Sequence, residues 1–386
     1  MATEAPPNPE KEEEIETGID PETIDSEISE PFDPKEIRVK SSTPTISLLL
    51  DRMEDGAINL APDFQRRAGI WTPQAKSRLI ESILIRIPLP AFYVDASDED
   101  YWLVVDGLQR LTSIKQYVKD QKLDNGQPFS LSGLEFLKEL EGKTFDDLPS
   151  NLKRRIKETE LTVFQIQPGT PPQVKFNIFK RINTGGLPLS AQEIRNAING
   201  DRVRKFVQEL AQSDQFLGAT LGSIGDKRMA DRECVTRFLA FRITDPADYQ
   251  LKDFDGFLND CMSKLDDPEE TSDARLDELR QEFLAAMDRA ARIFEYQAFR
   301  KFRSEGQRLS PINKALFEST ACGLASFSQD EADELIHYRQ QVIKDYEALN
   351  KDPAFDSAIS QGTGDPTRLR LRFEKMKLLL QDNLVG

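Results

Sequence analysis

Residues 101–114 have the sequence Tyr-Trp-Leu-Val-Val-Asp-Gly-Leu-Gln-Arg-Leu-Thr-Ser-Ile, in which a strand pattern runs directly into a helix pattern. The first five residues are apolar and rich in β-branched and aromatic side chains, which is typical of a buried strand. Asp106-Gly107 is a turn signal. Leu108, Leu111 and Ile114 then recur at helical spacing. The stretch therefore predicts a strand, a tight turn and a helix.

Polar residues gather at this turn in a way that suits an anion. The first turn of a helix offers unpaired backbone N–H groups and the positive end of the helix dipole, so it favours phosphate. Gly107 would let a ligand approach the backbone, and Arg110 could form two hydrogen bonds with a phosphate. Asp106 could hold a metal ion or orient a water molecule. The alternative is an ordinary corner in which Asp106 caps the helix while Gln109 and Arg110 are solvated.

Composition and charge indicate a folded protein with an acidic N-terminal tail. The 386 residues carry a formal net charge of −16, much of it within the first forty residues. Residues 1–36 contain few large apolar side chains, so they are predicted to be a disordered tail. The expected domains are residues 37–200 and a helical domain at 201–386. Because the folded part is only mildly acidic, nucleic-acid binding would require local basic patches.

Several classes of protein are excluded by residue usage. The three cysteines are far apart and lack metal-ligand spacing, so neither a disulfide framework nor a zinc site is expected. A single histidine, His337, excludes an HNH-type or two-histidine metal nuclease within this chain. No apolar run approaches the length of a membrane span, and the acidic, Pro-rich N-terminus does not resemble a signal peptide. A cytoplasmic location is therefore expected.

A second polar segment also suits an anion. A helix pattern before residue 182 is followed by Arg181, Asn183, Thr184 and Gly185-Gly186, which supply donors and a freely rotating backbone. The alternative is a glycine C-cap followed by a turn. Directly after this segment, the next helix is predicted from a capping box. Its N-cap is Ser190 and its third residue is Glu193.

Three basic stretches have less specific patterns. Lys153-Arg154-Arg155 with Lys157 lies on a helix-like run, where a solvated face is the first interpretation and contact with a phosphate backbone the second. Residues 299–303 and 368–372 alternate basic and apolar residues. This pattern predicts arginines whose stems pack on a helix while their charged heads stay in water, rather than a nucleic-acid surface.

Several sequence blocks, taken together and in this order, resemble one known family. The blocks are Phe64-Gln65-Arg66 with Trp71, Leu79–Leu84, Pro88-Leu89-Pro90, Val105–Ser113, and Phe179–Gly186 with Leu189 and Glu193–Asn196. They are similar to the GmrS-type N-terminal domain of the GmrSD restriction-endonuclease family, which resembles the ParB/sulfiredoxin fold. The resemblance implies an α+β protein, with a small mixed sheet in a ParB-like N-terminal domain and an all-α C-terminal domain.

The resemblance also implies a nucleotide site. The family motif Asp-Gly-Gln-Gln-Arg stands here as Asp106-Gly107-Leu108-Gln109-Arg110, with leucine in place of the first glutamine. Asp106, Gln109 and Arg110 are the implied catalytic residues for hydrolysis of a nucleoside triphosphate with Mg²⁺, and Asp106 is the implied metal ligand. The implied nucleotide-binding residues are Gln65, Arg66, Gly107, Thr112, Arg181, Asn183, Thr184, Gly185, Gly186 and Arg195.

The implied role is that of an NTP-dependent component of a bacterial restriction or antiphage system that senses or acts on modified DNA. The expected partners are the nucleotide, DNA and a separate nuclease or defence protein, with no membrane, and a homo-oligomer stays open. Two alternatives remain at this point. One is a nucleotide-regulated module that binds DNA or a protein partner without hydrolysis, and the other is a DNA nickase.

Overall fold

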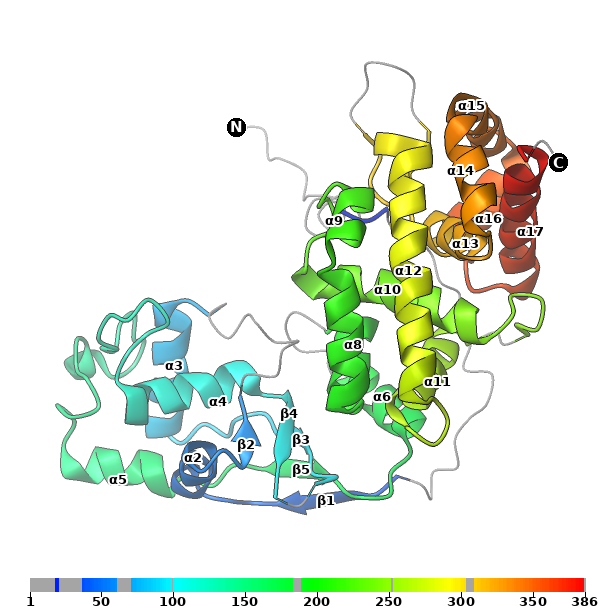
Figure 1. The fold of residues 1–386 in the computed structure, drawn as a ribbon. Coiled ribbons are helices and arrows are strands. Elements are labelled where there is room, and N and C mark those ends of the chain that lie inside the picture. Colours follow the sequence, from blue (N-terminus) through cyan, green and yellow to red (C-terminus); the bar gives the residue numbers. More distant parts are fainter. Residues whose placement is uncertain are drawn as a thin grey trace, which may run out of the picture. The chain divides into compact units, whose positions relative to one another are not determined.

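The computed structural model of this protein divides into two compact units (Figure 1). The sheet unit is Phe32–Leu189, and the helical unit joins Met1–Pro31 to Ser190–Gly386. The structure describes residues 18–20, 37–60, 71–98, 100–182, 189–250, 253–302 and 309–384. The division falls between residues 189 and 190, whereas the sequence predicted a boundary at residue 200.

The sheet unit alternates short strands with helices. Its elements are β1 (Val39–Ser42), α2 (Ile46–Glu54), β2 (Ile58–Asn59), α3 (Pro73–Leu84), β3 (Phe92–Asp95), β4 (Trp102–Asp106), α4 (Leu108–Lys115), a π-helical turn (Gln116–Asp120), a 3₁₀ turn (Lys138–Leu140), α5 (Ser150–Glu158), β5 (Val163–Ile166) and α6 (Pro172–Ile182). The strand expected at residues 101–105 corresponds to β4.

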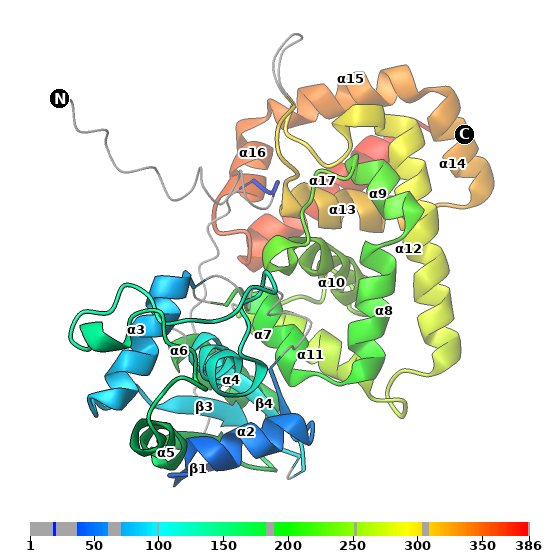
Figure 2. The ribbon, with the colours of Figure 1, turned by 90° about the vertical axis from the view of Figure 1, so that its left-hand side faces the viewer.

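The five strands form one mixed sheet in the order β1-β5-β3-β4-β2. β1 pairs with β5 and β3 with β4 in antiparallel fashion, while β5–β3 and β4–β2 are parallel pairs. Helices α2, α4 and α5 cover one face of the sheet (Figure 2). This arrangement, followed by a mainly helical remainder, confirms the predicted α+β class.

The core of the sheet unit follows from the two-residue period of its strands. Trp102 and Val104 of β4 alternate with Leu103 and Val105, and only the first pair joins the core between sheet and helices. Successive side chains of a strand point to opposite faces, so this alternation is what a sheet covered by helices requires. Strand β4 is buried along almost its whole length, which places its last residue, Asp106, at the rim of the core.

A buried carboxylate on α3 fixes the loop that precedes the 3₁₀ turn. Glu81 is 3% exposed, and its carboxylate accepts hydrogen bonds from the backbone N–H groups of Glu135, Phe136 and Leu137 at 2.7–3.1 Å. Burial acts to raise the pKa of Glu81, but these N–H donors outweigh burial and lower the pKa below its ordinary value of 4.5.

We expect Glu81→Gln to destabilise the sheet unit by about 1.5–3 kcal/mol at pH 7, because a charged acceptor of several hydrogen bonds is lost. The folded pKa lies below the unfolded one, so this stabilisation exists above pH 4.5 and disappears as pH falls through the folded pKa. Urea unfolding from pH 7 to pH 3 should show the two proteins converging in acid. Glu135→Gln, on an exposed side chain, is the control, and a constant difference across this range would contradict the assignment.

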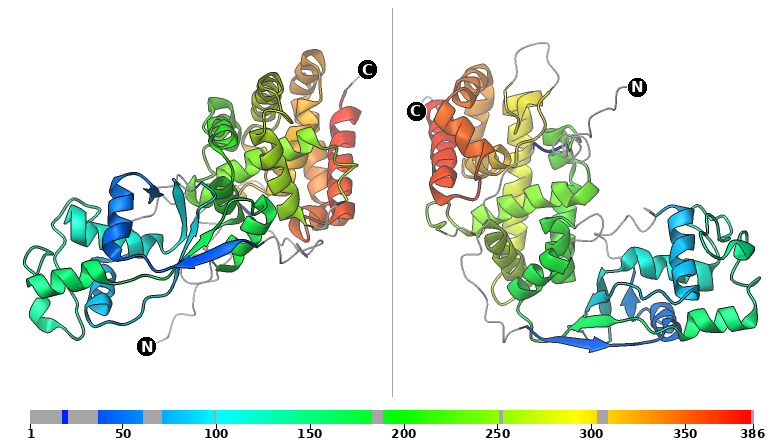
Figure 3. Two further views of the ribbon diagram at one scale, coloured as in Figure 1. Left: turned by 90° about the horizontal axis from the view of Figure 1, so that it is seen from below. Right: turned by 180° about the vertical axis from the view of Figure 1, so that it is seen from behind.

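The helical unit contains the remaining helices. They are α7 (Ala191–Ile198), α8 (Asp201–Ala211), α9 (Asp214–Thr220), a 3₁₀ turn (Lys227–Met229), α10 (Ala230–Ile243), α11 (Phe254–Asp266), α12 (Asp273–Phe294), a 3₁₀ turn (Glu295–Gln297), α13 (Lys314–Ala325), α14 (Gln329–His337), α15 (Arg339–Asn350), α16 (Pro353–Ser360) and α17 (Pro366–Asp382). The long helix α12 packs against α8, α9 and α13 (Figure 3). The predicted capping box of Ser190 and Glu193 is confirmed at the start of α7.

A buried ionic network connects α10, α13 and α17. Glu318 of α13 pairs through one carboxylate oxygen with Arg372 of α17 and through the other with Arg237 of α10, and all three side chains are 0% exposed. Arg237 also pairs with Glu233 at 2.8 Å, and Lys314 Nζ lies 3.0 Å from the same carboxyl group. Charges this deep in a protein persist only when they are paired and hydrogen-bonded.

The network corrects the prediction for the alternating basic stretches. Arg372 was expected to hold its charge in water, but it is fully buried and also donates to the carbonyl of Thr363 at 2.8 Å. Arg300 is 4% exposed and donates to the carbonyl of Thr220 and the hydroxyl of Ser223. Both guanidinium groups therefore stabilise the interior rather than a solvated face.

Residues 18–20 are packed against the helical unit although they lie within the predicted acidic tail. Ile19 is 4% exposed and belongs to the helical core. Gly18 accepts a hydrogen bond from the N–H of Ile312, and Asp20 donates its own N–H to the carbonyl of Ile312 at 2.8 Å. The carboxylate of Asp20 lies 3.0 Å from Lys301 Nζ. We call these three residues the N-terminal clip; the rest of residues 1–36 lies outside the described residues.

Within the described part of the chain, no helix combines the length and the apolar character that crossing a lipid bilayer requires.

Candidate functional site

The predicted turn between strand and helix is present, and glycine is required there for two reasons. Gly107 joins β4 to α4 with φ of +97°, in the left-handed region that favours glycine. A Cβ atom at this position would lie 2.3 Å from Cδ1 of Phe92, whose ring is 1% exposed. Gly107 is also the N-cap of α4, so the alternative in which Asp106 caps the helix is wrong.

Arg110 is held in one orientation by groups from β3, the segment before it and the last residue of β4. Its guanidinium donates to the carbonyl of Pro90, to the carbonyl of Ala91 at 3.2 Å and to Oδ2 of Asp106 at 2.8 Å. The group also lies over the ring of Phe92, 4.3 Å from the ring centroid. The Arg110 side chain is only 12% exposed, so the expectation of a solvated arginine is also wrong.

The surroundings shift the pKa values of both Asp106 and Arg110. Burial raises the pKa of Asp106 above its ordinary value, although the charge of Arg110 and the N–H of Gly107 act in the opposite direction. Burial likewise lowers the pKa of Arg110, and Asp106 opposes that change. A carboxylate with a raised pKa is a better proton acceptor near neutral pH than an ordinary aspartate, which is a common property of functional sites.

The pair keeps hydrogen-bonding capacity for a ligand. A guanidinium carries five N–H donors. Arg110 uses three of them within the described residues, two on Nη2 and one on Nη1. The second Nη1–H and the Nε–H therefore have no partner in the described part of the chain. These two N–H groups lie on different edges of the guanidinium group, so each can donate to a separate ligand oxygen that reaches the partly exposed side chain.

The other motif residues have different surroundings. Leu108 is 6% exposed and packs in the core of the sheet unit. Gln109 is half-buried, and its backbone carbonyl accepts the Ser113 hydroxyl at 2.6 Å. Thr112 is 8% exposed, and its hydroxyl has no hydrogen-bond partner among the described residues. Gln109 and Thr112 stay candidates, whereas Leu108 faces the core.

The structure places two further predicted ligands at different positions. Arg181 is exposed at the end of α6, next to the glycine segment. Arg195 lies in the helical unit, is 1% exposed, pairs with Asp255 and donates to Asn259 at 3.0 Å. Because these buried groups bind its guanidinium, we do not include Arg195 in the proposed site.

Six predicted ligands lie outside the described residues. They are Gln65, Arg66, Asn183, Thr184, Gly185 and Gly186. Their roles, and the predicted convergence of the two polar segments on one ligand, stay predictions. The sequence did not identify Phe92 or the carbonyls of Pro90 and Ala91 as the groups that hold Arg110, since nothing in their local pattern marks them.

Asp106 would be the residue that holds Mg²⁺. The described residues contain no group of three or more His, Cys, Asp or Glu side chains that could hold a metal ion. Mg²⁺ often binds through one or two carboxylates together with phosphate oxygens and water, so a single aspartate fits a metal that arrives with a nucleotide. Oδ2 of Asp106 is bound to Arg110, which leaves the other oxygen for this role.

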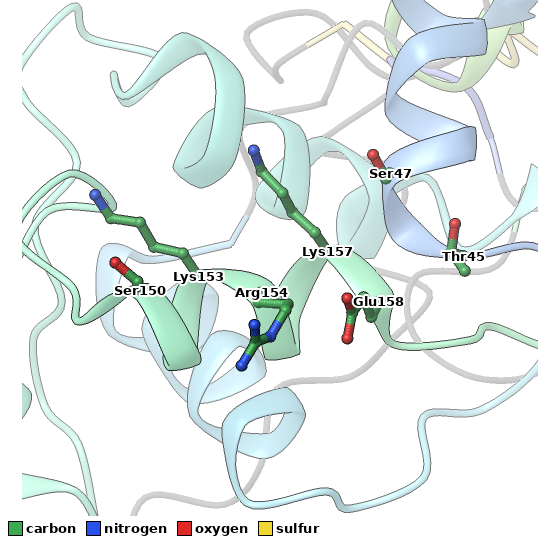
Figure 4. A pocket seen from close by; sticks show the side chains of 7 residues that line it. All are labelled: Thr45, Ser47, Ser150, Lys153, Arg154, Lys157 and Glu158. Atoms are coloured by element: carbon green, nitrogen blue, oxygen red, sulfur yellow. The ribbon is translucent and has the colours of Figure 1, made fainter.

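A surface pocket of about 450 Å³ lies elsewhere in the sheet unit (Figure 4). Its lining residues are Thr45, Ser47, Ser150, Lys153, Arg154, Lys157 and Glu158. None of them belongs to the predicted nucleotide site, so this pocket, which we call the α5 basic pocket, is a separate feature.

One comparison with known proteins agrees with the motifs described above. Residues 46–199 match a family described as GmrSD restriction endonuclease, N-terminal domain. The match covers most of the sheet unit and continues through α7. Searches of curated proteins and of solved structures found no match, so the likeness to the ParB/sulfiredoxin fold stays a prediction. Residues 46–199 therefore match the GmrSD restriction-endonuclease N-terminal domain family, as the sequence motifs predicted.

Proposed function

We propose that the turn between β4 and α4 binds and hydrolyses a nucleoside triphosphate, and that the protein serves a restriction or antiphage system acting on modified DNA. The family match supports the system, because that domain belongs to a restriction endonuclease. The observation that carries the nucleotide site is Arg110, which is fixed beside Asp106 with two N–H donors available. Fixed donors stabilise developing phosphate charge without reorganisation during the reaction.

Each residue has a stated role in this proposal. Arg110, with Arg181, stabilises the charge on the phosphate oxygens, and Gln109 orients the attacking water. Asp106, with its raised pKa, orients that water or takes up its proton. Gly107, whose backbone lies at the start of α4, lets a phosphate approach closely. Mg²⁺, when bound with the nucleotide, would neutralise charge on the phosphates.

The same proposal assigns roles to the other predicted ligands and to a second protein. Gln65, Arg66, Thr112, Asn183, Thr184 and Gly185-Gly186 complete the nucleotide pocket. DNA cutting is assigned to a separate nuclease, because this chain has one histidine and cannot build an HNH site. The nucleotide thereby regulates or drives an assembly that contains DNA and a second protein.

A second function is favoured by Leu108, which replaces the family's first glutamine and is buried in the core. A side chain in this position contributes no polar contact to the nucleotide. Under this alternative the nucleotide site at the turn between β4 and α4 binds nucleotide without turnover. It then acts as a switch for DNA or protein binding.

Phosphate release from full-length protein with Mg²⁺ and each of ATP, GTP, CTP and UTP tests the proposal. We expect Arg110→Ala to lower turnover at least tenfold, because the fixed donors are lost. Arg78→Ala, which removes an exposed arginine of the same unit, should leave turnover unchanged. Far-UV circular dichroism checks that each variant is folded.

Equal phosphate release by Arg110→Ala and the unchanged protein would contradict hydrolysis at this site. Nucleotide binding by calorimetry that requires Arg110, without any phosphate release, would instead establish the switch. Supercoiled modified plasmid that stays intact in the same reactions would remove the nickase alternative.

A further inference from the structure

We propose that the α5 basic pocket binds the phosphate backbone of double-stranded DNA. The pocket shares no residue with the Asp106–Arg110 site, so it supplies a second and independent contact. The inference rests on the proposed function only in taking DNA as the polymer, and its test does not require nucleotide turnover.

The charge of α5 is opposite to that of the chain. Nine residues of this helix contain four basic side chains and one acid, Glu158, whereas the whole chain has a net charge of −16. Arg155 turns inward and donates to the carbonyl of Leu84 at 2.8 Å. The remaining cations, Lys153, Arg154 and Lys157, line the pocket. A local basic surface on an acidic protein is the electrostatic signature of polyanion binding at one place.

The cations of the pocket are available to a ligand. Arg154 and Lys157 are exposed, and neither makes a hydrogen bond or an ion pair within the described ranges of the chain. Lys153 donates to the backbone carbonyl of Asp146 at 2.8 Å, while the Asp146 carboxylate lies 4.0 Å away. Only Lys153 is therefore partly bound by the protein itself.

An aromatic ring orients the two lysines. The ammonium groups of Lys153 and Lys157 lie 5.8 and 5.7 Å from the ring centroid of Phe145. The ring is 5% exposed, so it forms a fixed surface under both side chains. Lys153 and Lys157 extend from α5 in the same direction (Figure 4), which is the geometry that this shared contact produces. Side chains held in this way lose less conformational entropy on binding than free lysines do.

Side chains, rather than a helix terminus, supply the donors. In the first turn of α2, the N–H of Ile46 already donates to the carbonyl of Thr159, and the N–H of Leu48 donates to the Thr45 hydroxyl. The hydroxyls of Ser47 and Ser150 complete the lining. Lysine, arginine and serine side chains are the usual donors to DNA phosphates, where they fix position without reading sequence.

The shape of the pocket favours a polymer over a small anion. The cationic residues lie at positions i, i+1 and i+4 of α5, a span of about 6 Å along the helix axis. One DNA strand places a phosphate about every 3.4 Å along its axis, so Lys153 and Lys157 can reach nearby phosphates of one strand. Arg154, which extends to the other side of α5 in Figure 4, would contact a different phosphate. The lining residues Ser150, Arg154, Lys157 and Glu158 are exposed, and a small anion would keep most of its hydration there.

The test is fluorescence anisotropy with a labelled 20-base-pair duplex and full-length protein, at several salt concentrations. We expect Arg154→Glu with Lys157→Glu to weaken binding at least tenfold. The slope of log K against log salt should fall by about 1.8, since each phosphate contact contributes about 0.9. The control is Lys344→Glu with Lys377→Glu, which changes the net charge equally on exposed positions of α15 and α17 and should weaken binding less than twofold.

Equal losses in the two double variants would overturn the inference, because the effect would then be one of net charge. Absence of binding by the unchanged protein would overturn it as well. Displacement of the duplex by inorganic phosphate at an equal concentration of phosphate groups would identify a small-anion site and reject the polymer. Nucleotide binding by the Arg154→Glu, Lys157→Glu variant should persist. A loss of DNA binding with nucleotide binding intact would show that the two sites are tested independently.

Discussion

Replacing Glu318 by glutamine is expected to destabilise the helical unit by about 3–5 kcal/mol. Glu318 is the shared partner of Arg237 and Arg372, and all three side chains are 0% exposed. Glutamine has nearly the same volume but no charge, so two arginines would remain buried with less compensation. Removing one member of a buried ion pair costs far more than the intact pair contributes, because the charge that remains has lost both water and partner.

The position of the network explains why the effect should extend beyond one side chain. Glu318, Arg237 and Arg372 come from α13, α10 and α17, whose contacts bring distant parts of the helical unit together. Relief of the unbalanced charge would require these helices to separate or to admit water. Either response loses apolar burial around the network.

Urea unfolding with two probes measures this effect. Far-UV circular dichroism reports mainly on the helical unit, whereas tryptophan fluorescence reports on the sheet unit, which holds both tryptophans, Trp71 and Trp102. The dichroism midpoint of Glu318→Gln should fall by about 1–3 M urea. Glu278→Gln makes the same change on a side chain that is 64% exposed and should lower the free energy of unfolding by less than 1 kcal/mol. Similar shifts in both variants would refute the role of the network.

Gly107→Ala should destabilise the sheet unit by about 2–4 kcal/mol and abolish nucleotide binding. A left-handed backbone conformation costs a non-glycine residue about 1–3 kcal/mol, and overlap with a packed ring adds a similar amount. The new methyl group would meet the ring of Phe92. The same ring supports the guanidinium group of Arg110. The substitution therefore disturbs the turn and the orientation of Arg110 together.

Gly142→Ala is a matched control for this variant. Gly142 lies in the same unit with φ of +75°, and a Cβ atom there would meet nothing within 4 Å. It should show only the conformational part of the penalty, about 1–3 kcal/mol. Tryptophan fluorescence during urea unfolding compares the two proteins, and calorimetry measures nucleotide binding. Equal midpoints for the two alanine variants would mean that the contact with Phe92 is unimportant.

Local patterns predicted the parts of the structure that depend on neighbours in sequence. The change from strand spacing to helix spacing around Asp106-Gly107 predicted the turn, because period and glycine both act within a few residues. The capping box of Ser190 and Glu193 was predicted for the same reason. Arg110 was singled out by its place in the family motif, although its partners were not.

Features that depend on distant residues could not be predicted from local patterns. Arg110 is fixed by the carbonyls of Pro90 and Ala91, and a backbone carbonyl carries no sequence signature. Arg372 looked like a solvated arginine because the acid that pairs with it, Glu318, is 54 residues away. A basic residue between apolar neighbours is compatible with both outcomes, and only the tertiary partner decides between them.

The two sides of the N-terminal clip contact are translated at well separated times. Ile312, which pairs with Ile19 of the clip, is made 293 residues after it. At about 5–20 residues per second, translation separates the two by roughly 15–60 s. The whole sheet unit, Phe32–Leu189, is translated within this interval. The clip must therefore stay undocked while the sheet unit is made, although it precedes that unit in the sequence.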